Sequence, residues 1–453
     1  MYGYNTLNNN DKKLMLKEIG LETINSLFQD IPEPIRMIRQ LNLPQPYSEW
    51  ALEKKLVNLA KNNIHTDEYF CFLGGGYYNH FVPAVVDAIV NRSEFLTSYT
   101  PYQPEMSQGL LQALYEYQLL MAKITGLPIV SSSSYDGATA LADAALMCDS
   151  IQKENKNQKL LVAKSIWPQY LEVLKTYMSG RKIEIEMIDY DIKTGMLNFD
   201  ELRNQIQQEN PVGFLFQSPN AFGIIEDIAK VTNICNNAKV ISVLSFNPLT
   251  IGLLKTPGEL GVDIVTGEGQ PLGIHLNAGG SSLGILSTHS KYRQYIPGRL
   301  IGKVKDIKGN PAYSLVFENR EQHVAREKAN TNICSNQALN SIKSAIFLSY
   351  VGETGFRKLA MLNYEKTQYL MNNLLKLKDV ELVFNGMVFN EFVIKFPISV
   401  KIIIEKMLSK KIFAGIEYKN ISEIENTLLI SVTEKLDKGD LDYYISSLKE
   451  ILA

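Results

Sequence analysis

One short stretch of this sequence carries several side chains that could do chemistry on a rigid backbone. It is SYTPYQPEMSQG, residues 98–109, in which two prolines stiffen a turn that bears phenol, acid and amide groups. We take Tyr99, Tyr102, Glu105 and Gln108 as candidates for the edge of a pocket, because a rigid backbone with polar tips can hold a ligand. A buried turn whose tyrosines pack and form hydrogen bonds would show the same pattern without any ligand.

A second stretch, residues 320–334 (REQHVAREKANTNIC), gathers positive charge in a chain of near-neutral balance. Arg320, His323, Arg326 and Lys328 could meet a carboxylate or an acidic carrier, and we retain Arg326 as a site candidate. Glutamates alternate with these cations, so an internally paired, solvated helix face would give the same pattern. The residues alone favour neither interpretation.

A third stretch, GEGQPLGIHLNAGG (267–280), follows the short apolar strand Val262–Val265 and is rich in glycine, as backbone crowded against a ligand would be. In an enzyme that uses pyridoxal phosphate (PLP), a segment of this layout carries the lysine that binds the cofactor as a Schiff base. This segment has no lysine; the nearest are Lys255 and Lys291. A PLP enzyme without its central residue is one interpretation that follows.

A fourth stretch, SSSSYDGATA (131–140), places small residues and Thr139 at the start of a predicted helix. Backbone N–H groups at a helix start can cradle a phosphate. Capping of the helix by Ser134 or Asp136 needs no ligand and is the interpretation we favour. Whether a remnant phosphate site from Ser134 to Thr139 binds anything stays open.

Composition excludes several classes of protein. The chain has 453 residues with 46 basic and 48 acidic side chains, so no field of one sign points to nucleic acid or to an anionic membrane. No apolar run reaches the roughly 18 residues of a membrane span, and the polar amino terminus lacks a secretory core. Four widely spaced cysteines suit free thiols in the cytoplasm, and the five scattered histidines predict no metal site.

The elements that must position these residues alternate between strand and helix. Continuous apolar strands separated by helices predict a mainly parallel sheet covered on both faces. The strands are expected at 159–163, 183–188, 212–217 and 240–244, and the helices at 168–180, 199–208 and 225–237. The last third has long helices at 336–352 and 356–377, then short strands at 381–384, 390–396 and 427–432 and a helix near 441–452, which predicts a smaller α+β lobe.

A nicotinamide-cofactor site is a poor interpretation of this α/β pattern. The glycine cluster FLGGGYYN has Asn79 where the third glycine of a G-x-G-x-x-G fingerprint should stand. A tight glycine turn accounts for it better, and no P-loop or nucleophile elbow is present.

Several segments, taken in order, resemble the P-protein (glycine decarboxylase) of the glycine cleavage system, and specifically the α subunit of its two-chain form. They are FLGGGYYNHFVPAVVDAIVNRSEFLTSYTPYQPEMSQGLLQALYEYQ, YDGATALADAAL, GLLKTPGELGVDIVTGEGQPLGI, REQHVAREKANTNICSNQALN and NEFVIKF. The resemblance covers nearly the whole chain. It implies a PLP-dependent transferase fold of type I: a large domain around a mainly parallel, seven-stranded sheet and a small carboxy-terminal α+β domain.

The resemblance also implies an explanation for the absence of a lysine from this segment. Matching the glycine-rich segments puts Pro271 in place of the Schiff-base lysine, and Asn247 stands in place of the acid beneath the pyridine nitrogen. The family implies that a partner β subunit (subunit 2) binds PLP covalently. The complex would decarboxylate glycine and pass the aminomethyl group to the lipoamide arm of H protein. Tyr99, Tyr102, Glu105, Gln108 and Arg326 would border the partner's site.

Two alternative functions and a set of domain boundaries also follow from the sequence. The chain could be a catalytically silent scaffold, or an autonomous PLP enzyme of the cysteine-desulfurase kind, for which Cys334 at the start of the next helix is the candidate thiol. We expect a helical arm at 1–65 that lies along the body or embraces a partner, a large domain at 66–325 and a small domain at 326–453. The sequence does not decide whether the complex is a heterodimer or a heterotetramer, or which residues contact glycine or H protein.

Overall fold

The computed structural model describes residues 6–37, 39–98, 101–155, 157–181, 183–329, 331–419 and 424–453. The chain divides into two compact units, Met1–Ile64 and His65–Ala453. No helix in the described part of the chain is both long enough and apolar enough to cross a membrane.

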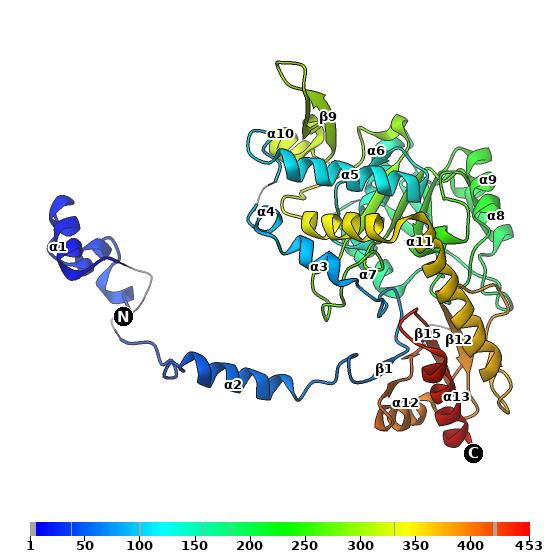
Figure 1. Cartoon of the computed structure of the whole chain (residues 1–453). Helices are drawn as coiled ribbons and strands as arrows, with labels where there is room; N and C mark the ends of the chain where they lie inside the picture. The colour runs from blue at the N-terminus through cyan, green and yellow to red at the C-terminus, as the bar shows by residue number, and fades with distance from the viewer. Residues whose placement is uncertain are drawn as a thin grey trace. The chain divides into compact units, whose positions relative to one another are not determined.

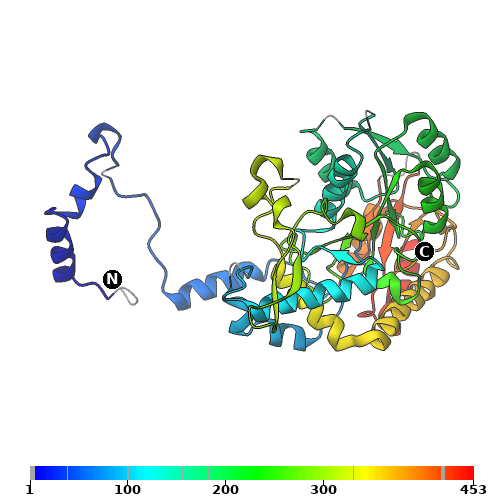
Figure 2. The ribbon, with the colours of Figure 1, turned by 90° about the horizontal axis from the view of Figure 1, so that it is seen from above.

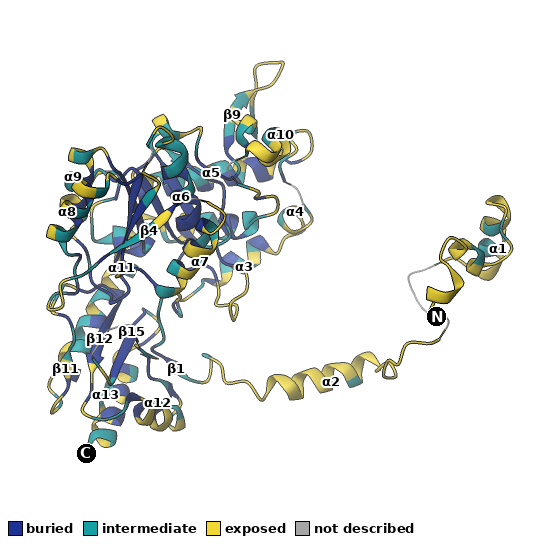
Figure 3. Ribbon diagram, turned by 180° about the vertical axis from the view of Figure 1, so that it is seen from behind, coloured by how far each residue is buried: buried dark blue, intermediate teal, exposed yellow. Residues whose placement is uncertain are grey.

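The first unit consists of short helices joined by extended chain (Figure 1). Its elements are α1 Asn9–Glu18, η1 Ile24–Phe28, η2 Glu33–Ile35 and α2 Glu49–Ala60. Ser48 caps α2, and Asn8 forms a capping box with Asp11 at the start of α1. None of this unit's described residues is buried, and Figure 3 shows α2 exposed along most of its length.

The second unit is built around a mixed sheet, for which the described residues give seven strands in the order β2-β8-β7-β6-β5-β3-β4. The five strands from β4 to β7 run parallel, β8 runs antiparallel to them, and β2 pairs antiparallel with β8. Every residue of β5, β6, β7 and β8 is buried, which explains the continuous apolar runs. The bounds are β2 Ile129–Val130, β3 Lys159–Ala163, β4 Glu184–Ile188, β5 Gly213–Ser218, β6 Ile241–Phe246, β7 Ile264–Glu268 and β8 Gly284–Thr288.

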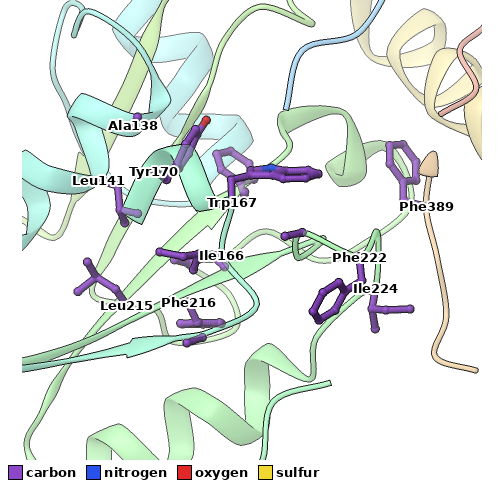
Figure 4. Close-up of a cluster of buried hydrophobic side chains, with 14 of the residues drawn as sticks. Ala138, Leu141, Ile166, Trp167, Tyr170, Leu215, Phe216, Phe222, Ile224 and Phe389 are labelled. Atoms are coloured by element: carbon purple, nitrogen blue, oxygen red, sulfur yellow. The ribbon is translucent and has the colours of Figure 1, made fainter. Parts of the chain in front are cut away.

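Helices cover this sheet and enclose its core. They are α5 Gln108–Thr125, α6 Gly137–Ile151, α7 Pro168–Met178, α8 Phe199–Glu209 and α9 Ile228–Ala238. The most deeply buried, α6, packs on strands β5 to β8 and on α7. In Figure 4, Ala138 and Leu141 of α6 lie beside Tyr170 of α7, within one apolar cluster.

The carboxy-terminal part is an antiparallel sheet flanked by helices. Its four described strands have the order β11-β12-β15-β14. The two predicted long helices are present as α11, which a non-helical backbone at Gly352 (φ 59°) divides in two. Helix α12 was not predicted, because its run of isoleucines is typical of a strand. The structure shows a helix whose Ile403 and Met407 are buried in the core. The bounds are α11 Ala338–Leu374, β11 Glu381–Leu382, β12 Glu391–Lys395, α12 Val400–Ser409, β14 Ile416–Glu417, β15 Thr427–Ser431 and α13 Lys438–Leu452.

Two further pairs of strands lie outside these two sheets. Near the start of the unit, β1 pairs with β13 in parallel, so chain that precedes the large sheet lies among the carboxy-terminal elements (Figure 1), which are orange and red in Figure 2. Strands β9 and β10 form a hairpin that projects from the body in Figure 1. The remaining elements are β1 Phe70–Cys71, α3 Ala84–Val90, α4 Ser93–Leu96, η3 Pro248–Gly252, η4 Ser290–Tyr292, β9 Ile301–Lys305, β10 Pro311–Leu315, η5 Glu318–Arg320, α10 Gln322–Ala325, η6 Arg326–Lys328 and β13 Ile412–Phe413.

Candidate functional site

A small buried cavity lies at the edge of the large sheet where its parallel strands end. Ser218 pairs with Phe246 and Phe246 with Gly267, so β5, β6 and β7 end in register and the residues after them converge, as they do in ligand sites of open α/β sheets. The cavity measures about 20 Å³, which is room for about one water molecule. It is lined by Gly76, Tyr78, Trp167, Tyr170, Gln217, Pro219, Ser245, Phe246, Asn247, Glu268 and Pro271.

The two positions where the resemblance implies lost chemistry, Pro271 and Asn247, line this one cavity. Pro271 lies in the turn after β7 and has no amine. Asn247 follows β6, and its Oδ1 accepts from the backbone N–H of Leu249 at 3.0 Å, which caps η3. Its Nδ2 is buried with no hydrogen-bond partner among the described residues. Neither position offers a Schiff-base amine or a carboxylate.

A carboxylate of the chain itself occupies the start of α6. The backbone N–H of Gly137, the first residue of α6, donates to Oε2 of Glu268 at 3.0 Å. Oε1 accepts from the backbone N–H of Gln270 at 2.9 Å and from the hydroxyl of Ser282. A helix start with a free N–H is where a phosphate would bind, and here a buried carboxylate already takes that place.

Burial dominates the electrostatics of this carboxylate. It raises the pKa of Glu268 to about 7, although hydrogen bonds from Ser282, Gly137 and Gln270 act in the opposite direction. Near neutral pH this carboxyl group is therefore only partly ionised, and it occupies the point where a bound phosphate would lie.

Capping of α6 is confirmed, and the residue that performs it is Asp136. Its Oδ1 accepts from the backbone N–H of Thr139 at 2.7 Å, and the Thr139 hydroxyl oxygen accepts from the backbone N–H of Asp136 at 3.1 Å. Ser134 instead pairs through its backbone with Gly284 of β8. The start of α6 is thus satisfied by Asp136 and Glu268 together.

The glycines of this region are crowded against the chain itself, not against a ligand. A Cβ on Gly267 would lie 2.6 Å from the carbonyl oxygen of Phe246, and one on Gly137 would lie 2.4 Å from the hydroxyl of Tyr170. Gln270 closes the wall further: its amide accepts from the N–H of Tyr78 and donates to the carbonyl of Tyr78, both at 3.0 Å.

These observations decide whether PLP fits this chain. A cavity of about 20 Å³ is far below the roughly 300 Å³ or more of small-molecule pockets. Pro271 cannot bind an aldehyde covalently, and Glu268 fills the anion position. The residues present do not fit PLP.

The tyrosine turn is only partly described. Tyr99 lies outside the described residues. The hydroxyl of Tyr102 donates to Oδ1 of Asn336 at 2.9 Å, and Cζ of Arg299 lies 5.4 Å from its ring centroid. Burial raises the pKa of Tyr102 to about 12. Tyr102 therefore connects the turn to the chain that leads into α11.

The other two candidates of the turn differ in their surroundings. Gln108 begins α5, and its side chain bonds both the N–H (2.8 Å) and the carbonyl (2.9 Å) of Tyr313 on the hairpin strand β10. Glu105 is exposed, and no described residue forms an ion pair or hydrogen bond with it. Gln108 thus joins α5 to the hairpin by two hydrogen bonds, whereas the Glu105 carboxylate has no polar partner among the described residues.

The charged stretch is not one helix face but three short turns, η5, α10 and η6. The side chain of Arg320 is only 6% exposed and forms an ion pair with Glu321 (2.6 Å), which also pairs with Arg299 (3.1 Å). His323 lies 2.9 Å from Glu318. Much of the expected positive charge is therefore neutralised internally.

Two residues of this region keep a different character. Arg326 is exposed, has φ 54°, and lines an open cavity beside α6 that also includes Cys334. The expectation that Cys334 starts a helix is wrong, because α11 begins only at Ala338. The thiol is exposed in the preceding loop and lacks the helix start that would favour a thiolate.

Sequence reasoning missed the residue that matters most in the buried cavity. Glu268 stands inside the quoted glycine-rich segment, directly at the end of an apolar strand, and a charged residue at that place is a usable signal. Tyr78, Gln270 and Arg299 carry no such signal, because their partners are distant in sequence.

Comparison with known proteins places the chain in a family. The family model of the glycine cleavage system P-protein matches residues 3–448. The probable glycine dehydrogenase (decarboxylating) subunit 1 of Oceanobacillus iheyensis is 43% identical and covers 99% of each chain, and that of Desulfitobacterium hafniense is 44% identical over 96% of this chain and 97% of its own.

Solved structures agree with this placement. A crystal structure of glycine decarboxylase (P-protein) of the glycine cleavage system, in inhibitor-bound form, has a TM-score of 0.91, 32% identity and full coverage of both chains. A cysteine desulfurase from Thermococcus onnurineus (TM-score 0.65, 14% identity, 85% of this chain and 95% of its own) shares the fold alone. The expected fold-type I architecture is confirmed. The chain therefore belongs to the glycine cleavage system P-protein family.

Proposed function

We propose that this chain is the cofactor-free subunit of a two-chain glycine dehydrogenase (decarboxylating). A partner β subunit binds PLP covalently, and PLP supplies the electron sink for decarboxylation of glycine. The complex passes the aminomethyl group to the lipoyl arm of H protein. This chain's part is to complete the complex and to border the partner's site.

One observation carries the proposal. Full-length similarity to subunit 1 proteins is combined with a cofactor position that the chain has filled with its own residues. Pro271 and Asn247 line a cavity of about 20 Å³, and Glu268 occupies the start of α6. A chain of this family without room for PLP needs a partner that holds it.

The edge of the partner's site is proposed to include Tyr99, Tyr102, Glu105, Gln108 and Arg326. Glu105 and Arg326 support this best, because both are exposed and neither forms an ion pair with a described residue. Charged groups without an internal partner are available to a second chain or to its substrate.

The experiment combines assembly, labelling and turnover. The chain is co-expressed with the β subunit, reduced with borohydride and mapped by peptide analysis. The pyridoxyl group should appear on a β-subunit lysine, and glycine–bicarbonate exchange should require both chains. A stoichiometric adduct on a lysine of this chain would overturn the proposal.

A silent scaffold is the second candidate, and one observation favours it. Tyr102 and Gln108 already form hydrogen bonds with Asn336 and with the backbone of Tyr313, so they need no ligand. Glu105→Gln separates the two functions. If Glu105 meets the partner's pocket, exchange per assembled complex should fall roughly tenfold or more, as loss of one buried polar contact does.

The matched control is Glu116→Gln on α5, an exposed glutamate that bonds only Gln112 on its own helix. Gel filtration of the same preparations measures assembly. Exchange per complex that stays at the wild-type value in Glu105→Gln would leave the chain as a scaffold.

A further inference from the structure

The hairpin of β9 and β10, which projects from the body in Figure 1, is held at its base by two glutamines of α5. Gln118 donates to the carbonyl oxygen of Ile301 at 2.9 Å and accepts from its backbone N–H at 3.0 Å. Gln108 forms the same two-bond pattern with Tyr313. A two-stranded hairpin by itself is only marginally stable in water. These side-chain amides bond to the strands as a neighbouring strand would, and they fix the hairpin on α5.

Apolar packing strengthens the same base. Ile301 is buried in a small cluster with Leu111 and Leu114 of α5, and the rings of Tyr313 and Tyr115 have centroids 5.4 Å apart. The far end of the hairpin is different, because every residue from 305 to 311 is exposed. An exposed end on a fixed base presents its side chains to a partner without the entropy cost of ordering a mobile loop.

The exposed end is basic. Lys303, Lys305 and Lys308 are exposed, and no described residue forms an ion pair or side-chain hydrogen bond with any of them. The one acid of residues 301–315 is Asp306, whose carboxylate accepts from the N–H groups of Lys308 and Asn310, both at 2.8 Å, and from the side-chain amide of Asn310 at 3.0 Å. This acid holds the turn together and pairs with no lysine. Three lysines less one aspartate leave the hairpin with a net charge of +2.

The tip also carries an apolar side chain, that of Ile307, which is fully exposed. One exposed apolar residue is ordinary, but this one lies between two of the lysines, so a partner that meets them would bury it. Permanent subunit interfaces are apolar and poor in lysine, whereas short-lived complexes use charged groups to guide the approach. The composition of the hairpin therefore favours a transient partner with an acidic surface over a permanent subunit.

The hairpin lies beside residues that are proposed to border the partner's site. Gln108 is one of those residues and bonds Tyr313 of β10 directly. Arg299, next to the ring of Tyr102, comes two positions before β9. A carrier that brings a lipoyl arm to that site has to approach this side of the chain.

We propose that the β9–β10 hairpin is the docking element for H protein, which meets it with an acidic surface. Lys303, Lys305 and Lys308 attract the carrier, and Ile307 is buried in the contact. The inference rests on the proposed function and deepens it, because it assigns the binding surface of the acceptor to this chain.

The test measures the binding of lipoylated H protein to the assembled complex by surface plasmon resonance, at about 0.05 M and about 0.5 M salt. Replacing the three lysines together by glutamine should lower the association rate constant at least about tenfold at low salt and much less at high salt, because salt screens the attraction. Ile307→Ser should instead raise the dissociation rate constant about fivefold at both salt concentrations, because an apolar contact is not screened.

Two control variants show whether the position of the charge matters. Lys395→Gln, Lys401→Gln and Lys406→Gln together change the net charge equally at exposed lysines of the carboxy-terminal part that form no ion pair with a described residue. Replacing the three hairpin lysines by arginine keeps their charge. Both controls should bind H protein as wild type does. An equal loss in the Lys395, Lys401 and Lys406 variant would overturn the proposal, as would wild-type binding by the lysine-to-glutamine hairpin variant or no binding of H protein to the wild-type complex.

Two further measurements separate the hairpin from the site and from the proposed function. Decarboxylation of glycine with free lipoamide as the acceptor needs no docking, so its rate per complex should be the same in wild type and in the hairpin variants. A matching loss with lipoamide, or loss of assembly with the β subunit in gel filtration, would overturn the docking role. A wild-type complex that cannot use lipoamide would refute the proposed function, and the binding measurements would still decide the role of the hairpin.

Discussion

Replacing Glu268 by alanine tests whether a carboxylate stands where a phosphate would bind. The change leaves the buried N–H groups of Gly137 and Gln270 without their acceptor. Each unpaired buried donor costs about 1–3 kcal/mol, so the two together cost roughly 2–6 kcal/mol. The cavity has room for about one water molecule, which can replace part of the lost bonding, and we therefore expect a loss near the lower end, about 2 kcal/mol.

Inorganic phosphate should reverse part of this loss. Once the carboxylate is gone, the start of α6 offers an N–H and a positive helix end to an anion. Phosphate at ten times its dissociation constant would add about 1.4 kcal/mol to the free energy of unfolding. Wild type should gain nothing, because Glu268 already occupies the position.

The assay is urea unfolding of the full chain at pH 8, where Glu268 with its pKa of about 7 is mostly ionised, with and without phosphate. Glu391→Ala is the matched control. Glu391 is also buried and accepts from a backbone N–H, that of Gly75 at 3.2 Å, and from the hydroxyl of Tyr78 at 2.6 Å, but it does not lie at a helix start. It should lose stability without rescue. Phosphate that stabilises both variants equally, or neither, would refute the reasoning.

Three further predictions concern other parts of the chain. Pro271→Lys combined with Asn247→Asp should still give no pyridoxyl adduct after borohydride reduction, because the cavity of about 20 Å³ has no room for PLP; a stoichiometric adduct on the new lysine would contradict this. The free energy of unfolding should fall by up to roughly 3 kcal/mol on account of Glu391 as pH rises from about 5 to 8. Burial raises the pKa of its carboxyl to about 7, so the folded state holds the proton longer than the unfolded chain; urea midpoints against pH should be flatter for Glu391→Gln. Gly352→Ala should destabilise by about 1–3 kcal/mol because of its φ of 59°, whereas Gly355→Ala in the same helix should be neutral or stabilise by up to about 1 kcal/mol, and equal effects of the two on the melting midpoint would contradict the kink.

Local pattern was sufficient for much of the fold. The strands at β3, β5 and β6 and the caps at Ser48 and Asp136 follow from apolar runs and from side chains that bond their own backbone nearby. These interactions reach only a few residues, so the sequence states them directly. The absence of a lysine from residues 267–280 can likewise be seen in the sequence without any structure.

The candidate site was decided by contacts between residues far apart in sequence. Glu268 at the end of β7 accepts from Gly137 at the start of α6, and Tyr78 donates to Glu391 in the carboxy-terminal sheet. Composition and spacing cannot predict such pairs, since burial and hydrogen bonding depend on how the whole chain closes. The sequence by itself determined that no lysine stands in the glycine-rich segment 267–280; only the tertiary structure decided that the carboxyl group of Glu268 occupies the start of α6, because that contact joins residues 131 positions apart.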